Sequence, residues 1–144
     1  IVGGHCGDAL TDADYNVAIG FGALGSDTKG NKNTAIGVDA LTSQNFTTPS
    51  DSGNTAVGYN AGLSITTGTE NVGIGYQALD ANTTGAANTA VGSEALGANT
   101  TANYNTAVGT AALILNTTGT RNTFSGKRLC ASLAHSCHHA MQNR

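Results

Sequence analysis

One short motif recurs along this chain at a nearly constant period, and that recurrence limits the folds open to it. Each copy begins with an asparagine, and successive asparagines are 17 residues apart except for one gap of 21. These residues are Asn16, Asn33, Asn54, Asn71, Asn88, Asn105 and Asn122. A fixed period of this size is typical of stacked repeat proteins, in which each unit contacts only its neighbours. We therefore expect a rod built from one small unit.

Within each copy, the residues after the asparagine alternate between larger and smaller side chains. Asn88, for example, is followed by Thr-Ala-Val and then by Gly92. This period-2 pattern predicts a short β-strand, and the glycine marks its end. An Ala-Leu pair further on predicts a second short strand in each coil. It occurs at 23–24, 40–41, 78–79, 95–96 and 112–113, with a variant in which Ala61, Gly62 and Leu63 place the leucine one residue later.

Two short strands, a turn and a loop within 17 residues make one flattened coil, and coils of this kind stack at about 4.8 Å. We predict an all-β fold, a parallel β-solenoid or β-roll of about seven coils. Residues 1–15 form a partial, irregular coil, and residues 16–126 form the tandem repeats. The longer repeat has a four-residue insertion within 42–53, which is either a tolerated loop extension or part of a binding face.

Residues 127–144 differ in character from the repeats and form a basic C-terminal cap that contains Cys and His. Apolar residues recur there at every fourth position, which favours a helix that covers the last coil: Leu129, Leu133, Cys137 and Met141. The Cys and His residues of this segment do not follow the spacing of a zinc site, so we predict no metal. At the other end, Ile1 to Gly3 match the end of a repeat strand, which predicts a processed chain or a fragment of a longer protein.

Composition and charge exclude several functions for the repeats. Residues 33–120 contain five acidic residues and no Lys or Arg, whereas residues 121–144 contain four basic residues and no acid. The repeats offer phosphate groups no cations, so we predict no nucleic-acid binding. No apolar run is long enough to cross a bilayer, so we predict no membrane insertion. Residues 16–120 contain no His and no Cys, and we therefore predict no enzyme and no cofactor.

Four sets of residues are candidates for particular roles. The asparagines that open each copy are expected to form a hydrogen-bonded ladder along the stack. Cys6, Cys130 and Cys137 lie outside the regular repeats and are candidates for a disulfide between chains. Paired threonines recur in register and form a candidate surface-binding array: Thr66, Thr67, Thr83, Thr84, Thr100, Thr101, Thr117 and Thr118. Asn-x-Thr sequons, which predict glycosylation in a eukaryotic secretory route, begin at Asn45, Asn82, Asn99 and Asn116.

Residues 16–126 resemble the Asn-Thr-Ala-Val-Gly repeats of phage tail-fibre proteins, through residues 88–92 and their copies together with the Ala-Leu and Asn-Thr-Thr-Gly elements. They are more distantly similar to the head repeats of trimeric autotransporter adhesins. The resemblance implies a parallel β-roll, usually in a homotrimer, that is displayed outside a cell or on a virion.

We expect a non-enzymatic structural fibre segment, extracellular or attached to a virion, that serves as a spacer and as a rod that binds a surface receptor or glycan. We expect its principal partner to be another copy of the same chain. One alternative is an extracellular filament subunit that stacks head to tail, assisted by the acidic body and the basic end. A second alternative is a solenoid that binds ice or glycan through its threonines.

Overall fold

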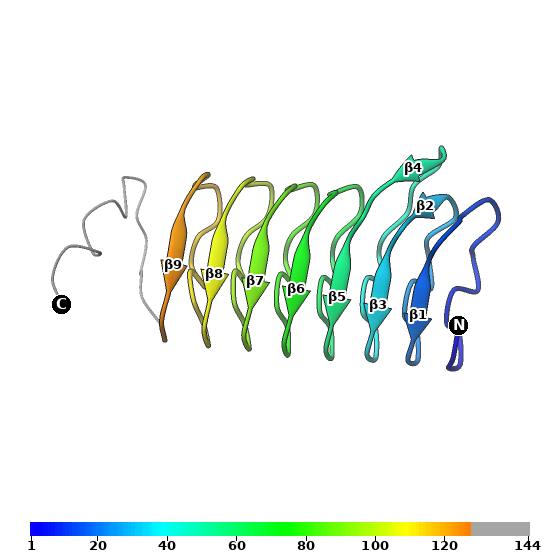
Figure 1. Ribbon diagram of the computed structural model, residues 1–144, viewed down its shortest axis with the longest axis horizontal. Helices are drawn as coiled ribbons and strands as arrows, with labels where there is room; N and C mark the ends of the chain where they lie inside the picture. Colours follow the sequence, from blue (N-terminus) through cyan, green and yellow to red (C-terminus); the bar gives the residue numbers. More distant parts are fainter. Residues whose placement is uncertain (128–144) are drawn as a thin grey trace, which may run out of the picture.

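The computed structural model describes residues 1–127 as a parallel β-solenoid, which confirms the fold class expected from the repeats (Figure 1). Seven strands form one parallel sheet in the order β1-β3-β5-β6-β7-β8-β9. Their bounds are β1 Val17–Ile19, β3 Thr34–Ile36, β5 Thr55–Val57, β6 Val72–Ile74, β7 Thr89–Val91, β8 Thr106–Val108 and β9 Thr123–Ser125. The described residues contain no helix. The expected capping segment lies outside them apart from Lys127, and so do Cys130 and Cys137.

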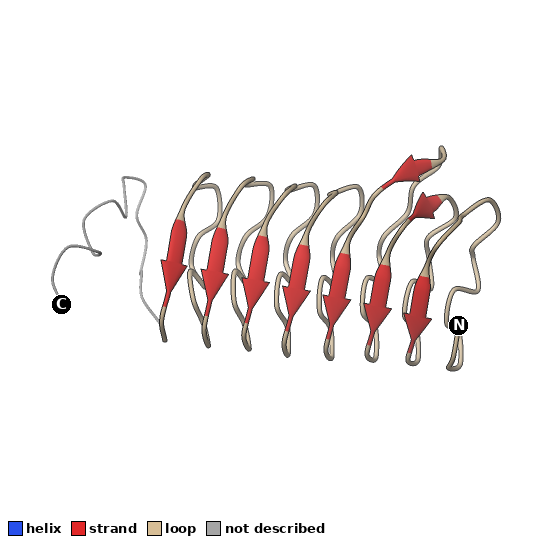
Figure 2. Ribbon diagram, in the orientation of Figure 1, coloured by secondary structure: helices blue, strands red, loops and turns tan. Residues whose placement is uncertain are grey.

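The strands of this sheet pair in register, so that one repeat position forms a straight column along the rod. Ala90 pairs with Ala107, for example, and Val91 pairs with Val108. The middle residue of each strand points into the coil, where Ala90 and Ala107 are fully buried, and the two flanking residues point outward. Figure 2 shows the strands on one side of the rod, with loops and turns completing each coil.

The prediction of a second strand at each Ala-Leu pair is wrong, because these residues form turns. Ala95 and Leu96 are both fully buried. Successive side chains of a strand point to opposite faces, so two neighbours can both point inward only where the backbone bends. Leu96 makes this bend with a φ of 51°. A left-handed conformation costs a non-glycine residue on the order of 1–3 kcal/mol, which burial of the leucine side chain, about 1.5–3 kcal/mol, offsets.

One coil fills the leucine column in a different way. Gly62, rather than Leu63, occupies the leucine position there, with a φ of 60°. A Cβ on Gly62 would lie 3.0 Å from Cδ1 of Ile65, whose side chain is buried. Ile65 belongs to the column that holds Asn82 in the next coil. The apolar side chain of Ile65, at a position that is asparagine in the following coils, therefore occupies the space of the missing leucine.

A column of glycines lets the coils approach closely where the strands end. Gly92 has a φ of 133°, and a Cβ on it would lie 2.5 Å from the carbonyl oxygen of Gly109. Gly58 makes the same approach to the carbonyl oxygen of Gly75, also at 2.5 Å. A side chain at either position would force neighbouring coils apart, so glycine is required for the stacking distance.

The longer coil contains the second sheet, in which β2 (Gly30–Asn31) pairs with β4 (Ser50–Asp51). A buried carboxylate anchors this region. Asp27 accepts hydrogen bonds from the backbone N–H groups of Gly30, at 3.2 Å, and Phe46, at 3.0 Å. It also accepts one from Nε2 of Gln44 at 2.7 Å. These donors satisfy a charge that would otherwise be costly to bury, and they tie the insertion to the stack.

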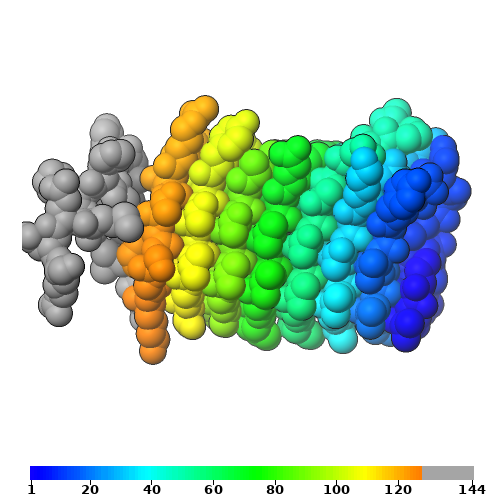
Figure 3. Space-filling view, viewed as in Figure 1, coloured from blue at the N-terminus to red at the C-terminus, as the bar shows by residue number. Residues whose placement is uncertain are grey.

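The two ends of the described stack differ. At the N-terminal end, Val2 forms a bridge with Ile19, and Cys6 occupies the buried column that holds Ala23 in the next coil. At the other end, Phe124 takes the inward position of β9, paired with Ala107, and packs against the core of the last coils. The space-filling view in Figure 3 shows the layered coils between these ends, with the insertion as a projection over one edge.

Candidate interaction surface

The outward side chains of the large sheet form the main apolar surface. We call this surface the strand face and define it as the first and third residues of the seven strands. It carries no charged residue, and it contains Val or Ile at the third position of every strand except β9. The first position is Val in β1 and β6 and Thr in the other five strands. Ile19, Ile74 and Val108 are 40 %, 39 % and 41 % exposed. Because the inward position of the strands is a small residue in every strand except β9, the β-branched aliphatic side chains lie outside rather than inside the coil.

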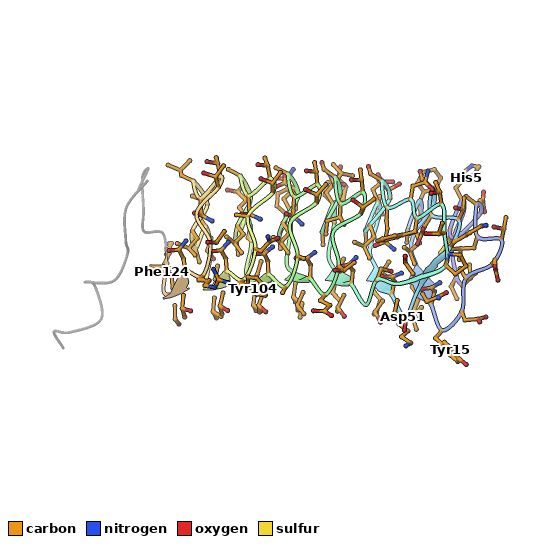
Figure 4. All side chains as sticks on the ribbon, turned by 90° about the horizontal axis from the view of Figure 1, so that it is seen from above. His5, Tyr15, Asp51, Tyr104 and Phe124 are labelled. Carbon is orange, nitrogen blue, oxygen red and sulfur yellow. The ribbon has the colours of Figure 1, made fainter. Side chains whose placement is uncertain are left out.

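A polar column borders the strand face on one side. It consists of the residues that immediately precede each repeat asparagine, and we call it the rim column. Figure 4 shows two of its members, Tyr15 and Tyr104, on the same side of the rod as the strands, whereas His5 lies on the opposite side. The Arg121 guanidinium lies 5.2 Å from the centroid of the Tyr104 ring, a cation–π contact.

The insertion adds an ion pair to the rim column. Lys32 pairs with Asp51 of β4, and the hydrogen bond from Lys32 holds the pKa of Asp51 below its ordinary value. Both side chains are largely exposed, so solvent screens the pair and it adds little to stability. The rim column thus places charged groups along one side of the uncharged strand face, and protein interfaces commonly combine an apolar centre with a polar rim.

A second apolar strip adjoins the strand face at its other side. We call it the aromatic edge: the residues that follow the strand-ending glycines, namely Phe21, Val38, Tyr59 and Tyr76, with Ser93 and Thr110 at the same place in the later coils. Tyr59 and Tyr76 are each 49 % exposed. Their rings stack with centroids 5.6 Å apart and an angle of 10°. The recurrence of large apolar residues just after the glycines could have identified this edge from the sequence, but the sequence analysis overlooked it.

The repeat asparagines line the interior and connect each coil to the next. Oδ1 of each one accepts a hydrogen bond from the backbone N–H of the following asparagine, at 2.8–3.0 Å, through all six steps from Asn16 to Asn122. Direct bonds between side chains also occur, as from Nδ2 of Asn88 to Oδ1 of Asn71 at 3.1 Å. Nδ2 of Asn88 donates across the coil to the carbonyl of Ala102 as well. The asparagines therefore hold the stack together and are not a binding site.

The structure separates the paired threonines into two columns. In the first column, the hydroxyls of Thr66, Thr83 and Thr100 donate to the carbonyl oxygens of Thr83, Thr100 and Thr117 in the next coil. These hydroxyls are thus used within the rod. The second column is exposed and consists of Thr67, Thr84, Thr101 and Thr118. Half of the expected array is therefore open to a ligand.

The sequons also separate into two kinds. Asn82 and Asn99 are fully buried, and their Nδ2 atoms, to which a glycan would be attached, donate to the carbonyls of Gly85 and Ala102 at 2.9 and 3.1 Å. Asn116 is half-buried and makes the same bond to Gly119 at 2.9 Å. A glycan on Asn82 or Asn99 is therefore incompatible with the folded chain. Asn45 is exposed.

Few titratable groups come together in the described part of the chain. Cys6 is only 4 % exposed, so its thiol is covered by the chain's own coils. Among residues 1–127, no three His, Cys, Asp or Glu side chains are placed to bind a metal. Over the same residues, no helix has the length and apolarity needed to cross a bilayer. Burial raises the pKa of Asp80, and the nearby Glu94 acts in the same direction.

Comparison of the chain with protein-family models, with curated proteins and with solved structures finds no match.

Proposed function

We propose that this chain is a non-catalytic structural rod whose copies pack through their strand faces to form a fibre segment, which serves as a spacer and carries a surface-binding end. The observation that supports this proposal is the strand face: a long, regular, uncharged surface with half-exposed Ile and Val side chains. Contiguous apolar surface of this kind usually marks an interaction site.

A second copy of the chain is the partner that fits this surface best. The strand face repeats at the spacing of paired strands, about 4.8 Å, and another copy presents apolar columns with the same spacing over the same length. Covering one half-exposed aliphatic side chain contributes on the order of 1 kcal/mol. Association loses about 4–15 kcal/mol of translational and rotational freedom. Packing must therefore extend over many coils, as it would between rods that lie side by side.

The number of copies and the location are proposed from the resemblance of the repeats. Three copies around a common axis, outside a cell or on a virion, is the arrangement implied by the tail-fibre and adhesin repeats that residues 16–126 resemble. Closed symmetry of this kind covers the strand face of every copy and prevents open-ended growth.

Phe124 makes the head-to-tail filament a weaker alternative. Its phenyl ring occupies a column that holds only Ala or Gly in the six preceding strands. A further coil stacked in register would need the space of a small side chain at that point, and overpacking of this kind typically costs 1–3 kcal/mol. Side-by-side packing avoids this clash.

Light scattering across a range of protein concentrations, with and without reductant, tests the proposal. We expect a constant mass of three chains that does not depend on reductant. Ile74→Lys combined with Val91→Lys places charges at the centre of the strand face and should give monomers. Leu115→Lys, at an exposed leucine outside the strand face, is the matched control and should leave the mass unchanged. Far-UV circular dichroism checks that each variant is folded.

Other results would overturn the proposal in specific ways. A monomeric wild-type chain would remove it and direct attention to ice, which thermal hysteresis measurements on the monomer would detect. A mass that grows with concentration and falls in reductant would establish the filament alternative.

A further inference from the structure

Two periodic rods that pack side by side can align in several axial registers. Because the coils are nearly identical, a strand face shifted by one coil meets its partner almost as well as an unshifted one. The third position is Ile or Val in β1, β3, β5, β6, β7 and β8, so the third-position column distinguishes poorly between these arrangements. A unique alignment requires a neighbouring feature that does not repeat.

The aromatic edge is such a feature, and it continues directly from the strand face. Tyr59 and Tyr76 stand two residues beyond Val57 and Ile74, separated from them only by Gly58 and Gly75. Ser93 replaces tyrosine in the next coil. The edge is therefore apolar in the coils that begin at Asn16 to Asn71 and polar in later ones.

The tyrosine pair is built to make directional contacts. The two rings already stack on one another, which leaves their outer edges and about half of each side chain accessible. Aromatic pairs contribute about 0.5–1.5 kcal/mol beyond the burial of area, and they do so only in particular geometries. A shift of one coil would place one tyrosine opposite Ser93 of the other copy and would leave one tyrosine opposite a tyrosine, so it would remove one of the two aromatic pairs.

We propose that Tyr59 and Tyr76 set the axial register in which copies of this chain pack, by contacting the aromatic edge of a neighbouring copy. This inference depends on the proposed side-by-side packing. The strand face supplies most of the association free energy, and the tyrosine pair selects the unshifted alignment. The tyrosines are therefore specificity-determining residues rather than the main source of affinity.

Distances between spin labels on neighbouring copies test this role. A label on Thr110→Cys lies on the same edge, outside the tyrosine pair, in a chain that also carries Cys6→Ala, Cys130→Ser and Cys137→Ser. Cys6→Ala matches the alanines of its own column. With both tyrosines present, we expect one narrow distance between labels. Tyr59→Ser with Tyr76→Ser, which copies Ser93, should keep the oligomer and add distances from copies displaced axially in steps of about 4.8 Å.

Tyr15→Ser with Tyr104→Ser is the matched control, because it removes two exposed tyrosines of the rim column and should keep the narrow distribution. An unchanged narrow distribution in the Tyr59/Tyr76 variant would overturn the register role while leaving the proposed packing intact. Absence of any dipolar coupling in the parent protein would instead show that the chain is monomeric, and the proposed function would fail with it.

Discussion

The regular coils and the longer coil reach the same stacked geometry by different means. From Asn71 to Arg121, one pattern of hydrogen bonds repeats at every turn. Around the coil that begins at Asn33, a network of unlike residues supplements the ladder. Nδ2 of Asn33 donates to Oγ of Ser52, and Asp27 and Gln44 occupy the positions that Asn82, Asn99 and Asn116 hold in later coils. The stack thus tolerates a longer loop when every inward polar group keeps a partner.

The comparison also shows where the structure is least permissive. Backbone approaches backbone in the glycine column, and nothing can move aside there. In the insertion, by contrast, the chain runs over the surface and has room. We therefore expect equal substitutions to have unequal effects in the two regions.

Glycine substitutions should show the largest contrast. Gly92→Ala brings a Cβ to 2.5 Å from the carbonyl oxygen of Gly109 at a φ of 133°, and we expect a loss of more than about 3 kcal/mol or failure to fold. Gly53→Ala lies in the insertion, where nothing is within 4 Å of the new Cβ and φ is 59°. Its expected loss is about 1 kcal/mol. Urea unfolding measures both, and equal losses would contradict the comparison.

Removal of one ladder asparagine should come next. Asn88→Ala deprives both the backbone N–H and the Nδ2 of Asn105 of their acceptor inside the rod. Each buried group left unsatisfied costs about 1–3 kcal/mol, so we expect a loss of roughly 2–5 kcal/mol in the free energy of unfolding.

Asn16→Ala is the control for that experiment, because Asn16 is only partly buried at the first strand. Its loss should be smaller, since water can reach the freed groups. A larger loss at Asn16 than at Asn88 would refute the ladder as the main polar support of the regular coils.

Substitutions at Gly62 and Ile65 can convert this coil to the Leu and Asn combination of the regular coils. Gly62→Leu alone should overpack against Ile65 and cost about 1–3 kcal/mol, and Ile65→Asn alone should leave a cavity. The double variant restores the combination found at Leu79 and Asn82. We expect a favourable coupling of about 0.5–3 kcal/mol in a double-mutant cycle, and additive losses would show that the two columns are independent.

The smallest expected effects are those of pH. The pKa of Asp80 is raised by burial from an ordinary value of 3.8, so the folded state binds a proton more tightly than the unfolded chain. Stability should therefore fall as pH rises from about 3.8 through the folded pKa, and Asp80→Asn should abolish that fall.

Asp51 should change stability with pH in the opposite direction to Asp80. Its pKa is lowered by Lys32, so its contribution is present above its unfolded pKa and is lost as pH falls through the folded value. Asp51→Asn should remove this small gain. Thermal unfolding between acid and neutral pH measures both variants, and parallel pH profiles for Asp80→Asn and wild type would contradict the assignment.

The sequence predicted the stacked coils well, because the evidence for them is local. Thr89, Ala90 and Val91 alternate with a period of 2, and the 17-residue spacing aligns each strand with the next. The predictions from the sequence were wrong where contacts between coils determine the backbone conformation and the burial of a side chain. The left-handed φ of Leu96 and the burial of Asn82 and Asn99 have no signature in a single repeat.

The sequence predicted the candidate interaction surface only in part. The alternation of larger and smaller side chains predicted a strand but did not show which of its two sides faces outward. Which side it was depended on the width of the interior, and alanine columns leave no room there for Ile or Val.

The sequence alone determined the period, the parallel pairing in register and the need for glycine after each strand, because each follows from the geometry of one short unit repeated many times. Only the tertiary structure decided that the Ala-Leu pairs are turns, that the first threonine column bonds from coil to coil, that two of the sequon asparagines face inward, and that Tyr59 and Tyr76 form one edge. Residues 17 positions apart become neighbours only when the coil closes, and coil closure imposes the backbone angles that direct these side chains.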